Sequence, residues 1–403
     1  MKIFRFARLW CVLAVGLAVL AVAGPSAGGR LVPSTNHDWS IPSTPNPGVY
    51  GNIIWGMSAR TANDVWAVGV QETQTSNDTL AIHWNGASWT AVPTPNPMPD
   101  CQDGNIQWGG QSLNSVAAIS AKDVWAVGSG CYSFDAIIEH WNGTAWSMVA
   151  GASPRDGGGA TASLYGVAAI SPSNVWAVGY SGAGGFQTMI EHWNGSSWQV
   201  SSGGGLTGYL SSVSATGPND VWAAGATNNG NLILHWDGAA WAVVQTPQPA
   251  GSAIDSITAL SPSDAWAVGS KRGSSGGEVT FTLHWNGTTW SEVASPNVST
   301  AGNATNQLRS VVVISKNDIW ALGMYRNEQT LFQHRTLAVH WDGSSWSLVD
   351  SPTPGRTGEL TSAAAVPSGV TPGQLFAGGY FSYYDRNIYD GHYTDPRTLV
   401  LRG

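Results

Sequence analysis

The chain has 403 residues, of which only 10% are charged, and its formal net charge is −8. This acidic balance disfavours a nucleic-acid partner, because phosphate binding requires a basic stripe. Glycine is abundant, with 50 residues, and short apolar runs are separated by small polar residues. Such a composition is typical of an extracellular β-protein.

The first 23 residues have the pattern of a secretory signal peptide. Lys2, Arg5 and Arg8 precede an apolar run over residues 9–20, and Ala-Val-Ala at 21–23 supplies small residues for cleavage. The alternative, an uncleaved membrane anchor, is disfavoured because the run is shorter than the roughly 20 residues that a span needs. Cleavage removes three positive charges and takes the net charge to −11. We expect a secreted protein with no stable membrane span after cleavage.

A repeated sequence organises the rest of the chain. Its cleanest copy contains Asn-Val-Trp-Ala-Val-Gly at 174–179 and Glu-His-Trp-Asn-Gly-Ser-Ser-Trp at 191–198. Each copy predicts four strands: an inner strand of small residues, a second strand over the Asp-Val-Trp motif, a third ending at Asn-Gly or Asp-Gly, and an outer strand that begins at the next Trp. The Asn-Gly and Asp-Gly pairs accept positive φ and are strong hairpin signals. The copies recur at a spacing of roughly 45 to 60 residues, which favours one closed array over two separate domains.

Six copies are complete and a seventh is degenerate. The complete copies are marked by second-strand tryptophans at Trp66, Trp125, Trp176, Trp222, Trp266 and Trp320. The seventh has three recognisable strands, over residues 362–366, 374–379 and 398–401, and then the chain stops. Its missing outer strand is matched by an orphan segment around Trp39, near the start of the domain. We therefore predict an all-β fold: a seven-bladed β-propeller of four-stranded blades, closed by an N-terminal strand that completes the last blade.

The predicted domain organisation follows directly. Residues 1–23 are the signal peptide, 24–36 a linker and 37–403 a single propeller domain. The expected blades span about 51–93, 111–152, 162–203, 209–247, 253–296, 307–352, and 359–403 with 37–45.

The repeat resembles the kelch-like propellers, whose blades pair a Gly at the end of strand two with an aromatic-turn-Trp hairpin. The Asn-Gly-x-x-Trp hairpins are also similar to a degenerate Asp-box of the sialidase-type propellers. The chain departs from the kelch pattern in having mostly one Gly where that motif has two, the exception being Gly378-Gly379. The resemblance implies the fold, and it implies little about activity because propellers host many unrelated functions.

Most tryptophans and histidines are explained by the blades themselves. Nineteen of the 22 tryptophans occupy repeat positions, and the exceptions are Trp10, Trp55 and Trp108. Six histidines precede the hairpin Trp and share a blade end with the Asp of the second strand, so we expect structural His–Asp contacts. The remaining histidines are too scattered for a zinc pattern, and we predict no metal and no cofactor.

Two cysteines, Cys101 and Cys131, remain after cleavage of the signal peptide. In an oxidising compartment an even pair indicates a disulfide, and both fall on the same side of one predicted blade.

Strand alternation places the short, uniform turns on one face and the variable links on the other. The variable links join strands two and three and join blade to blade, so function is expected on that face. Aromatic, Arg and His side chains in these links suit recognition of a ligand. The predicted ligand-binding residues are Trp108, Tyr132, Tyr325, Arg326, His334, Tyr383, Tyr384, Asp385, Tyr389 and His392.

The sequence thus favours a monomeric binding module for a glycan or protein ligand. The alternative is an extracellular glycoside hydrolase or lyase with a loop-borne acid pair at the channel mouth, for which the candidate acids are Glu328, Asp385, Asp390 and Asp395. No nucleophile motif, arginine cluster or metal spacing identifies a catalytic residue.

Overall fold

The computed structural model describes residues 37–74, 76–96, 110–130, 136–152, 161–182, 185–327, 333–367, 373–383 and 396–403. The chain divides into two units, Met1–Leu31 and Val32–Gly403, and every described residue belongs to the second.

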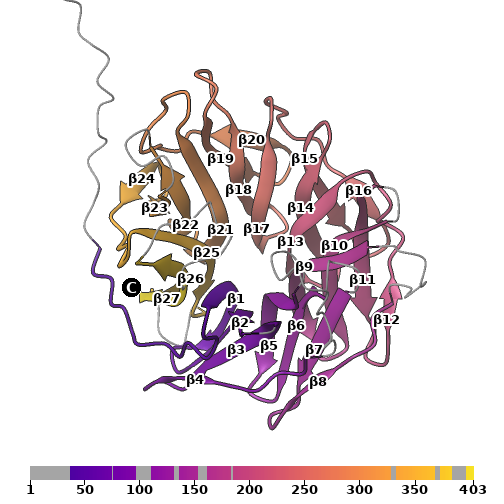
Figure 1. The fold of residues 1–403 in the computed structure, drawn as a ribbon. Coiled ribbons are helices and arrows are strands. Elements are labelled where there is room, and N and C mark those ends of the chain that lie inside the picture. The colour runs from indigo at the N-terminus through magenta and orange to yellow at the C-terminus, as the bar shows by residue number, and fades with distance from the viewer. Residues whose placement is uncertain are drawn as a thin grey trace, which may run out of the picture. The chain divides into compact units, whose positions relative to one another are not determined.

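The second unit is a seven-bladed β-propeller, as predicted. Six antiparallel sheets have four strands in sequence order from the inside outward, and the seventh has three. The first strands of consecutive sheets contact one another around the ring, and those of the seventh and first sheets also meet. Figure 1 shows the seven sheets arranged around a common axis.

The strand bounds follow the repeat. The inner strands are β1 (Gly51–Thr61), β5 (Ser112–Ser120), β9 (Thr161–Ser171), β13 (Tyr209–Gly217), β17 (Ala253–Ser261), β21 (Thr305–Ser315) and β25 (Thr357–Ala365). The second strands are β2 (Asp64–Glu72), β6 (Asp123–Ser129), β10 (Asn174–Gly182), β14 (Asp220–Thr227), β18 (Asp264–Arg272), β22 (Asp318–Arg326) and β26 (Leu375–Ser382). The third strands are β3 (Asn77–Trp84), β7 (Ala136–Trp141), β11 (Gln187–Trp193), β15 (Gly230–Trp236), β19 (Glu278–Trp285), β23 (Arg335–Trp341) and β27 (Arg397–Arg402). The outer strands are β4 (Trp89–Ala91), β8 (Trp146–Met148), β12 (Trp198–Val200), β16 (Trp241–Val243), β20 (Trp290–Val293) and β24 (Trp346–Val349).

The predicted hairpins between third and outer strands are present. In the first blade, Asn85 Oδ1 accepts hydrogen bonds from the backbone N–H groups of Ala87 and Ser88, both at 3.0 Å. Gly86 follows with φ of 96°, a conformation that residues with a Cβ rarely adopt. The Asn-Gly dipeptide therefore sets the reversal by its own side chain and backbone.

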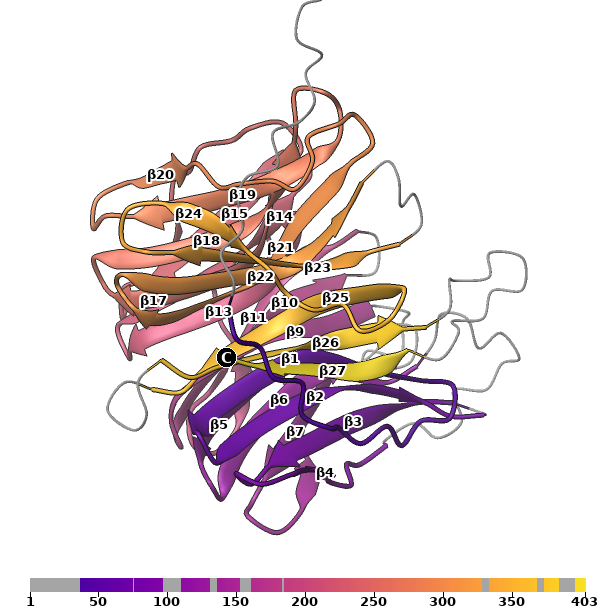
Figure 2. The same cartoon turned by 90° about the vertical axis from the view of Figure 1, so that its left-hand side faces the viewer.

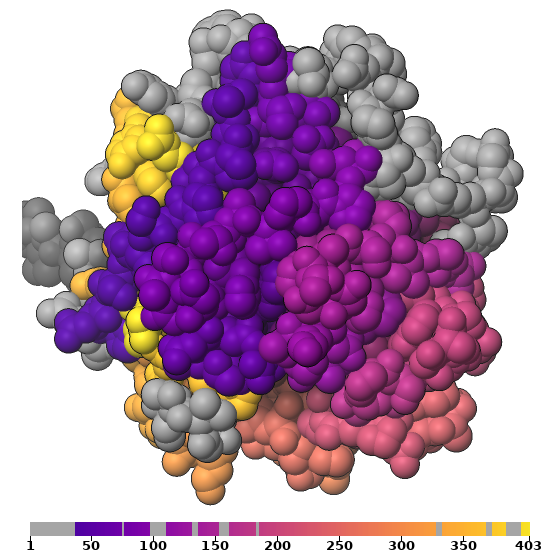
Figure 3. Space-filling model, turned by 90° about the horizontal axis from the view of Figure 1, so that it is seen from below, coloured from indigo at the N-terminus to yellow at the C-terminus, as the bar shows by residue number. Residues whose placement is uncertain are grey.

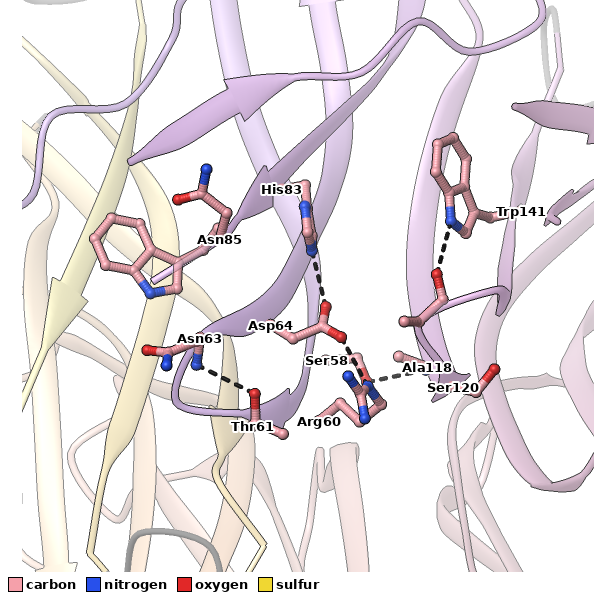
Figure 4. A network of polar contacts seen from close by, with 12 residues as sticks. Ser58, Arg60, Thr61, Asn63, Asp64, His83, Asn85, Ala118, Ser120 and Trp141 are labelled. Carbon is pink, nitrogen blue, oxygen red and sulfur yellow. Dashed lines mark hydrogen bonds and ion pairs between the residues drawn. The ribbon is translucent and has the colours of Figure 1, made fainter. Parts of the chain in front are cut away.

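The repeated tryptophans and histidines form a cage between neighbouring blades. The ring centroid of Trp66 lies 4.4 Å from that of His83 in its own blade and 5.2 Å from those of Trp141 and Trp146 in the next. His83 Nε2 lies 2.8 Å from Asp64 Oδ1, and Figure 4 shows Asp64 held between this ring and an arginine. The predicted structural role of these residues is confirmed, because each side chain joins a strand to its neighbour.

The same cage recurs around the ring. It is centred on Trp125, Trp176, Trp222 and Trp266 in the second to fifth blades.

The N-terminal segment supplies the missing part of the last cage. Trp320 stacks near His37 and Trp39, with centroid separations of 4.8 and 5.6 Å, so these two rings replace the hairpin Trp pair of the other blades. Ser40 exchanges two backbone hydrogen bonds of 2.9 Å with Arg402. Trp39 Nε1 also donates to the carbonyl of Asp350 at 2.8 Å. The predicted closure by an N-terminal strand is confirmed.

Three views of the molecule show this closure. In Figures 1 and 2 the indigo N-terminal segment runs beside β27, and in the space-filling view of Figure 3 the indigo and yellow ends of the domain are packed against each other.

Deletion of residues 35–44 should destabilise the propeller. The deletion exposes Trp320 and leaves an open edge on β27, so we expect a melting temperature lower by about 5 °C or more. Thermal unfolding followed by circular dichroism measures this, with deletion of residues 24–33 as the control. If the protein without residues 35–44 and the full chain had equal melting temperatures, the ring would close without this segment.

One buried acid is out of place in this repeat. Glu139 in β7 is fully buried, neither carboxylate oxygen has a hydrogen-bond partner, and burial raises its pKa to about 8. The equivalent position is Leu234 in the fourth blade and Leu283 in the fifth. In the third blade it is Glu191, whose carboxylate accepts a hydrogen bond from the N–H of Ala152.

Glu139→Leu should therefore stabilise the protein, and more so at higher pH. The unfolded chain ionises this group above its ordinary pKa of 4.5, whereas the folded chain resists ionisation until about 8, so wild-type stability falls as pH rises through this window. We expect a gain of about 2 kcal/mol or more at pH 8 and a smaller gain at pH 5, measured by urea unfolding. Glu191→Leu is the matched control and should gain less, because it loses a hydrogen bond. An equal gain for both variants would contradict the account.

Candidate functional site

Every inner strand carries a β-bulge at the same place. In the first blade Ile54 pairs with Gly69 and Gly56 pairs with Val68, which leaves Trp55 as the extra residue. The other six inner strands show the same one-residue shift against their second strands. A bulge bends the strand and redirects the side chain of its extra residue.

The glycine that ends the repeated second-strand motif accompanies this bulge. A Cβ at Gly69 would lie 1.8 Å from the carbonyl oxygen of Ile53, so only glycine fits beside the bulged strand. The equivalent glycines of the other blades would place a Cβ at most 2.1 Å from the corresponding carbonyl oxygen, and they are Gly128, Gly179, Gly225, Gly269, Gly323 and Gly379.

The bulge residue differs in every blade, although its neighbours do not. The preceding residue is always a fully buried Ile or Leu, and the following residue is always Gly or Ser. The seven bulge residues are Trp55, Asn114, Tyr165, Ser211, Asp255, Arg309 and Thr361. We call them the bulge ring.

The serine that follows the bulge holds adjacent blades together. Ser362 Oγ in the last blade accepts a 2.9 Å hydrogen bond from the N–H of Met57 in the first. Four further serines accept equivalent bonds of 3.0–3.3 Å from the next blade, and these are Ser115, Ser212, Ser256 and Ser310. These repeated contacts explain why the position beside the bulge changes so little.

Three bulge residues also bind the next blade. Asn114 Nδ2 donates to the carbonyl of Leu164 at 2.9 Å. Ser211 Oγ donates to the carbonyl of Ile254 at 2.7 Å, and Thr361 Oγ1 makes the same kind of bond, at 2.6 Å, to the first blade. The other four ring members have larger or charged side chains, and two of them, Asp255 and Arg309, contact the next inner strand through charged side chains instead of a backbone carbonyl.

The bulge ring surrounds a cavity of about 790 Å³ on the propeller axis, and all seven ring members line it. This volume suits a small ligand or a few residues of a polymer. Phe186 also lines the cavity and belongs to the link between β10 and β11, so the cavity reaches the face that carries the variable links.

Aromatic side chains form one wall of the cavity. The ring centroid of Tyr165 lies 5.7 Å from that of Tyr180 and 6.5 Å from that of Tyr209, and Phe186 lies 4.4 Å from Tyr180. Phe186 is 55% exposed, so part of this wall faces solvent. Trp55, which is 36% exposed, lines the cavity from the first blade, and its ring centroid lies 6.5 Å from that of Tyr380. An exposed aromatic wall inside a cavity indicates a ligand-binding surface.

Charged side chains form another wall, on the fifth to seventh blades. Arg309 Nε donates to Glu359 Oε1 at 2.9 Å, and Arg309 Nη1 lies 3.4 Å from Asp255 Oδ2. Tyr380 donates its hydroxyl to Glu359 at 3.2 Å, and His334 Nδ1 lies 3.9 Å from the same carboxylate. One guanidinium therefore bridges two carboxylates that come from blades about 50 residues away on either side.

Burial shifts the acid–base properties of this wall. It raises the pKa of Asp255 to about 6, against the opposing effect of Arg309. It also lowers the pKa of His334, against the effect of Glu359. Burial alone would lower the pKa of Arg309, but the two carboxylates outweigh it and the net shift is upward. At neutral pH this wall thus holds two carboxylates, a guanidinium and a neutral imidazole.

The sequence-predicted ligand residues that the structure describes lie around the cavity rather than in it. Tyr325 packs partly buried against the core of its blade, and Arg326 Nη2 lies 3.5 Å from Thr305 Oγ1. Tyr383 is 50% exposed and stacks edge-on with Phe381. None of these three lines the cavity, and of the four predicted residues that the structure describes, only His334 contacts the charged wall.

The other predicted residues lie outside the described part of the chain. These are Trp108, Tyr132, Tyr384, Asp385, Tyr389 and His392, the acids Glu328, Asp390 and Asp395, and the cysteines Cys101 and Cys131.

Among the described residues, no group of His, Cys, Asp and Glu is arranged to hold a metal ion. The described part of the chain also contains no helix long and apolar enough to cross a bilayer.

No protein-family model and no curated protein matches the chain. Solved structures of propellers do match. One is the structure of YCF48 bound to D1 peptide, whose sequence is 14% identical to this chain. The match covers 94% of this chain and 99% of that chain, with a TM-score of 0.57. The RRP9 WD40 repeats are 11% identical, with 92% and 98% covered and a TM-score of 0.56. The GH74 xyloglucanase from Xanthomonas campestris is 12% identical, with 89% of this chain but 55% of that chain covered and a TM-score of 0.54. At these identities the likeness shows the β-propeller fold alone.

Proposed function

We propose that this chain is a binding module whose ligand, a protein segment or a glycan, enters the cavity inside the bulge ring. The observation that carries the proposal is the difference among the seven bulge residues between two nearly constant neighbours. A side chain that a blade needs for folding recurs along the repeat, as the caged tryptophans do in six of the seven blades. A ring position that is never repeated is instead suited to the asymmetric shape of a ligand.

The lining of the cavity supports binding. Rigid aromatic rings give contact area at a small entropic cost, and the fixed polar groups opposite them give orientation. The fold also suits this role, since similar propellers include one described with a bound peptide. The ligand class of this chain remains part of the proposal, because the fold is shared with a xyloglucanase as well.

The second candidate function is glycoside hydrolysis in the same cavity. It is favoured by two carboxylates, Asp255 and Glu359, of which Asp255 has a raised pKa of about 6, as a general acid requires. Against it, Arg309 bridges both carboxylates and holds them in an ion-pair network. Release of reducing sugar from a panel of polysaccharides, abolished by Asp255→Asn, would favour this candidate over binding alone.

Trp55→Ser and Tyr165→Ser should each weaken ligand binding at least about tenfold without unfolding the protein. Each change removes one aromatic contact, and the fourth blade already accepts serine at the equivalent position, Ser211. Retention on peptide and glycan arrays, followed by titration of the retained ligand, measures the effect.

The matched control is Tyr383→Ser, since Tyr383 is exposed but does not line the cavity. Loss of binding in the Tyr383 variant, with full binding in the Trp55 and Tyr165 variants, would place the site on the variable link that contains Tyr383 and refute the cavity.

We also propose that the protein acts outside the cell. The support is the basic, apolar and small-residue pattern of residues 1–23. Expression with a C-terminal tag should yield a mature protein in the medium that begins just after residue 23, as determined by N-terminal sequencing. Retention of the full-length chain in the membrane fraction would contradict export by cleavage.

A further inference from the structure

The charges that line the cavity do not balance. Its described lining contains two carboxylates, Asp255 and Glu359, and one guanidinium, Arg309, so its formal charge at neutral pH is −1. Glu359 is only 7% exposed, and the side chain of Asp255 is 21% exposed. A partly buried charge without a full partner is costly, and a group of opposite charge would relieve the cost.

Among the described residues, Arg309 is the only cation in the lining, and Arg326, whose charge acts on His334, lies outside it. His334 lies 3.9 Å from Glu359, but burial lowers its pKa and keeps it neutral at pH 7. Glu278 adds a further negative charge near Asp255, and Tyr209 beside it is a neutral phenol. Of the charged groups that act on Asp255, Arg309 is thus a cation, and Glu359 and Glu278 are anions.

The aromatic wall adds a second requirement on the ligand. Tyr165, Tyr180 and Phe186 offer apolar ring faces, which pack against methylene groups and attract cations. Trp55 adds a further aromatic ring to the lining, beside Tyr380. A side chain with an apolar stem and a terminal charge satisfies both walls at once. Lysine and arginine have this form, whereas a neutral sugar satisfies the rings and leaves the excess carboxylate unpaired.

We infer that the cavity takes a Lys or Arg side chain from a polypeptide partner, with its stem along the aromatic wall and its charge beside Asp255 and Glu359. The inference rests on the proposed function and names its ligand class. The cavity, at about 790 Å³, also has room for the residues that flank such a side chain.

The test uses the mature chain and capped pentapeptides with a central Arg, Lys or Gln between glycines, titrated by calorimetry. We expect the Arg and Lys peptides to bind at least about tenfold more tightly than the Gln peptide at pH 8 and low salt. Butylamine, which has the charge and stem without a peptide, is a further arm. Binding of butylamine as tight as that of the Lys peptide would overturn the assignment to a polypeptide.

Asp255→Asn should abolish this preference, with a loss of about tenfold for the Arg peptide. The matched control is Asp237→Asn, an exposed hairpin position at which four other blades carry Asn, and it should bind like the wild type.

Wild-type affinity for the Arg peptide should also fall between pH 8 and pH 5, because Asp255 becomes protonated below its pKa of about 6. The Asp255→Asn variant should lack that part of the fall. Thermal melting curves of both variants serve to check that they are folded.

The outcomes separate the two proposals. Equal binding of the Gln and Arg peptides, or no binding of any peptide, overturns the inference. If a neutral oligosaccharide binds and Trp55→Ser blocks it, the cavity is a binding site but not for a basic side chain. If every ligand found is insensitive to Trp55→Ser and Tyr165→Ser, the proposed function fails as well.

Discussion

The contact on which the rest of this structure depends is the approach of a second-strand glycine to the backbone of the inner strand. A Cβ at Gly69 would overlap the carbonyl oxygen of Ile53, and six other blades repeat this geometry. The glycine permits the bulge, and the bulge sets one residue per blade apart from the ladder. A motif that looks purely structural in the sequence therefore determines where seven variable side chains meet.

The contacts that hold the ring together and the residues of the proposed binding site lie in different parts of each blade. The Trp–His cages join neighbouring blades toward the face with the short turns, and serines such as Ser362 tie the inner strands together. The last cage is completed by His37 and Trp39, and the seventh blade replaces the usual Trp and His with Phe376 and Arg402, which still pack on the first blade. Because these repeated contacts hold the ring, the bulge residues are free to differ.

The sequence was sufficient to predict the architecture. The repeat gave the strand order and the blade number, and the orphan Trp39 gave the closure, because each feature depends on local patterns that recur. The His–Asp contacts were predictable for the same reason. The cavity was not predicted, although Trp55 already stood out as a tryptophan outside the repeat positions.

Two physical reasons explain the miss. A bulge breaks the alternation of strand residues, so simple period-two counting does not show which residue faces the axis. The charged wall also joins Asp255, Arg309 and Glu359, which are about 50 residues apart and meet only through the ring. Aligning the seven inner strands against one another would have revealed the ring, since one column varies completely between an aliphatic column and a Gly/Ser column.

Because structural contacts and bulge residues are separate, the bulge ring can vary without loss of the fold, as the proposed binding function requires. Asn114, Ser211 and Thr361 use their side chains to bind the next blade, so the ring is partly structural. Blades with Trp55 or Tyr165 close without that bond, which shows that a blade does not require it. A substitution at the bulge therefore alters the charge and shape of the cavity while the cages, the serines and the glycines keep the ring intact. Under the proposed function, the ligand preference of the propeller depends chiefly on the bulge residues that make no bond to a neighbouring backbone, Trp55, Tyr165, Asp255 and Arg309.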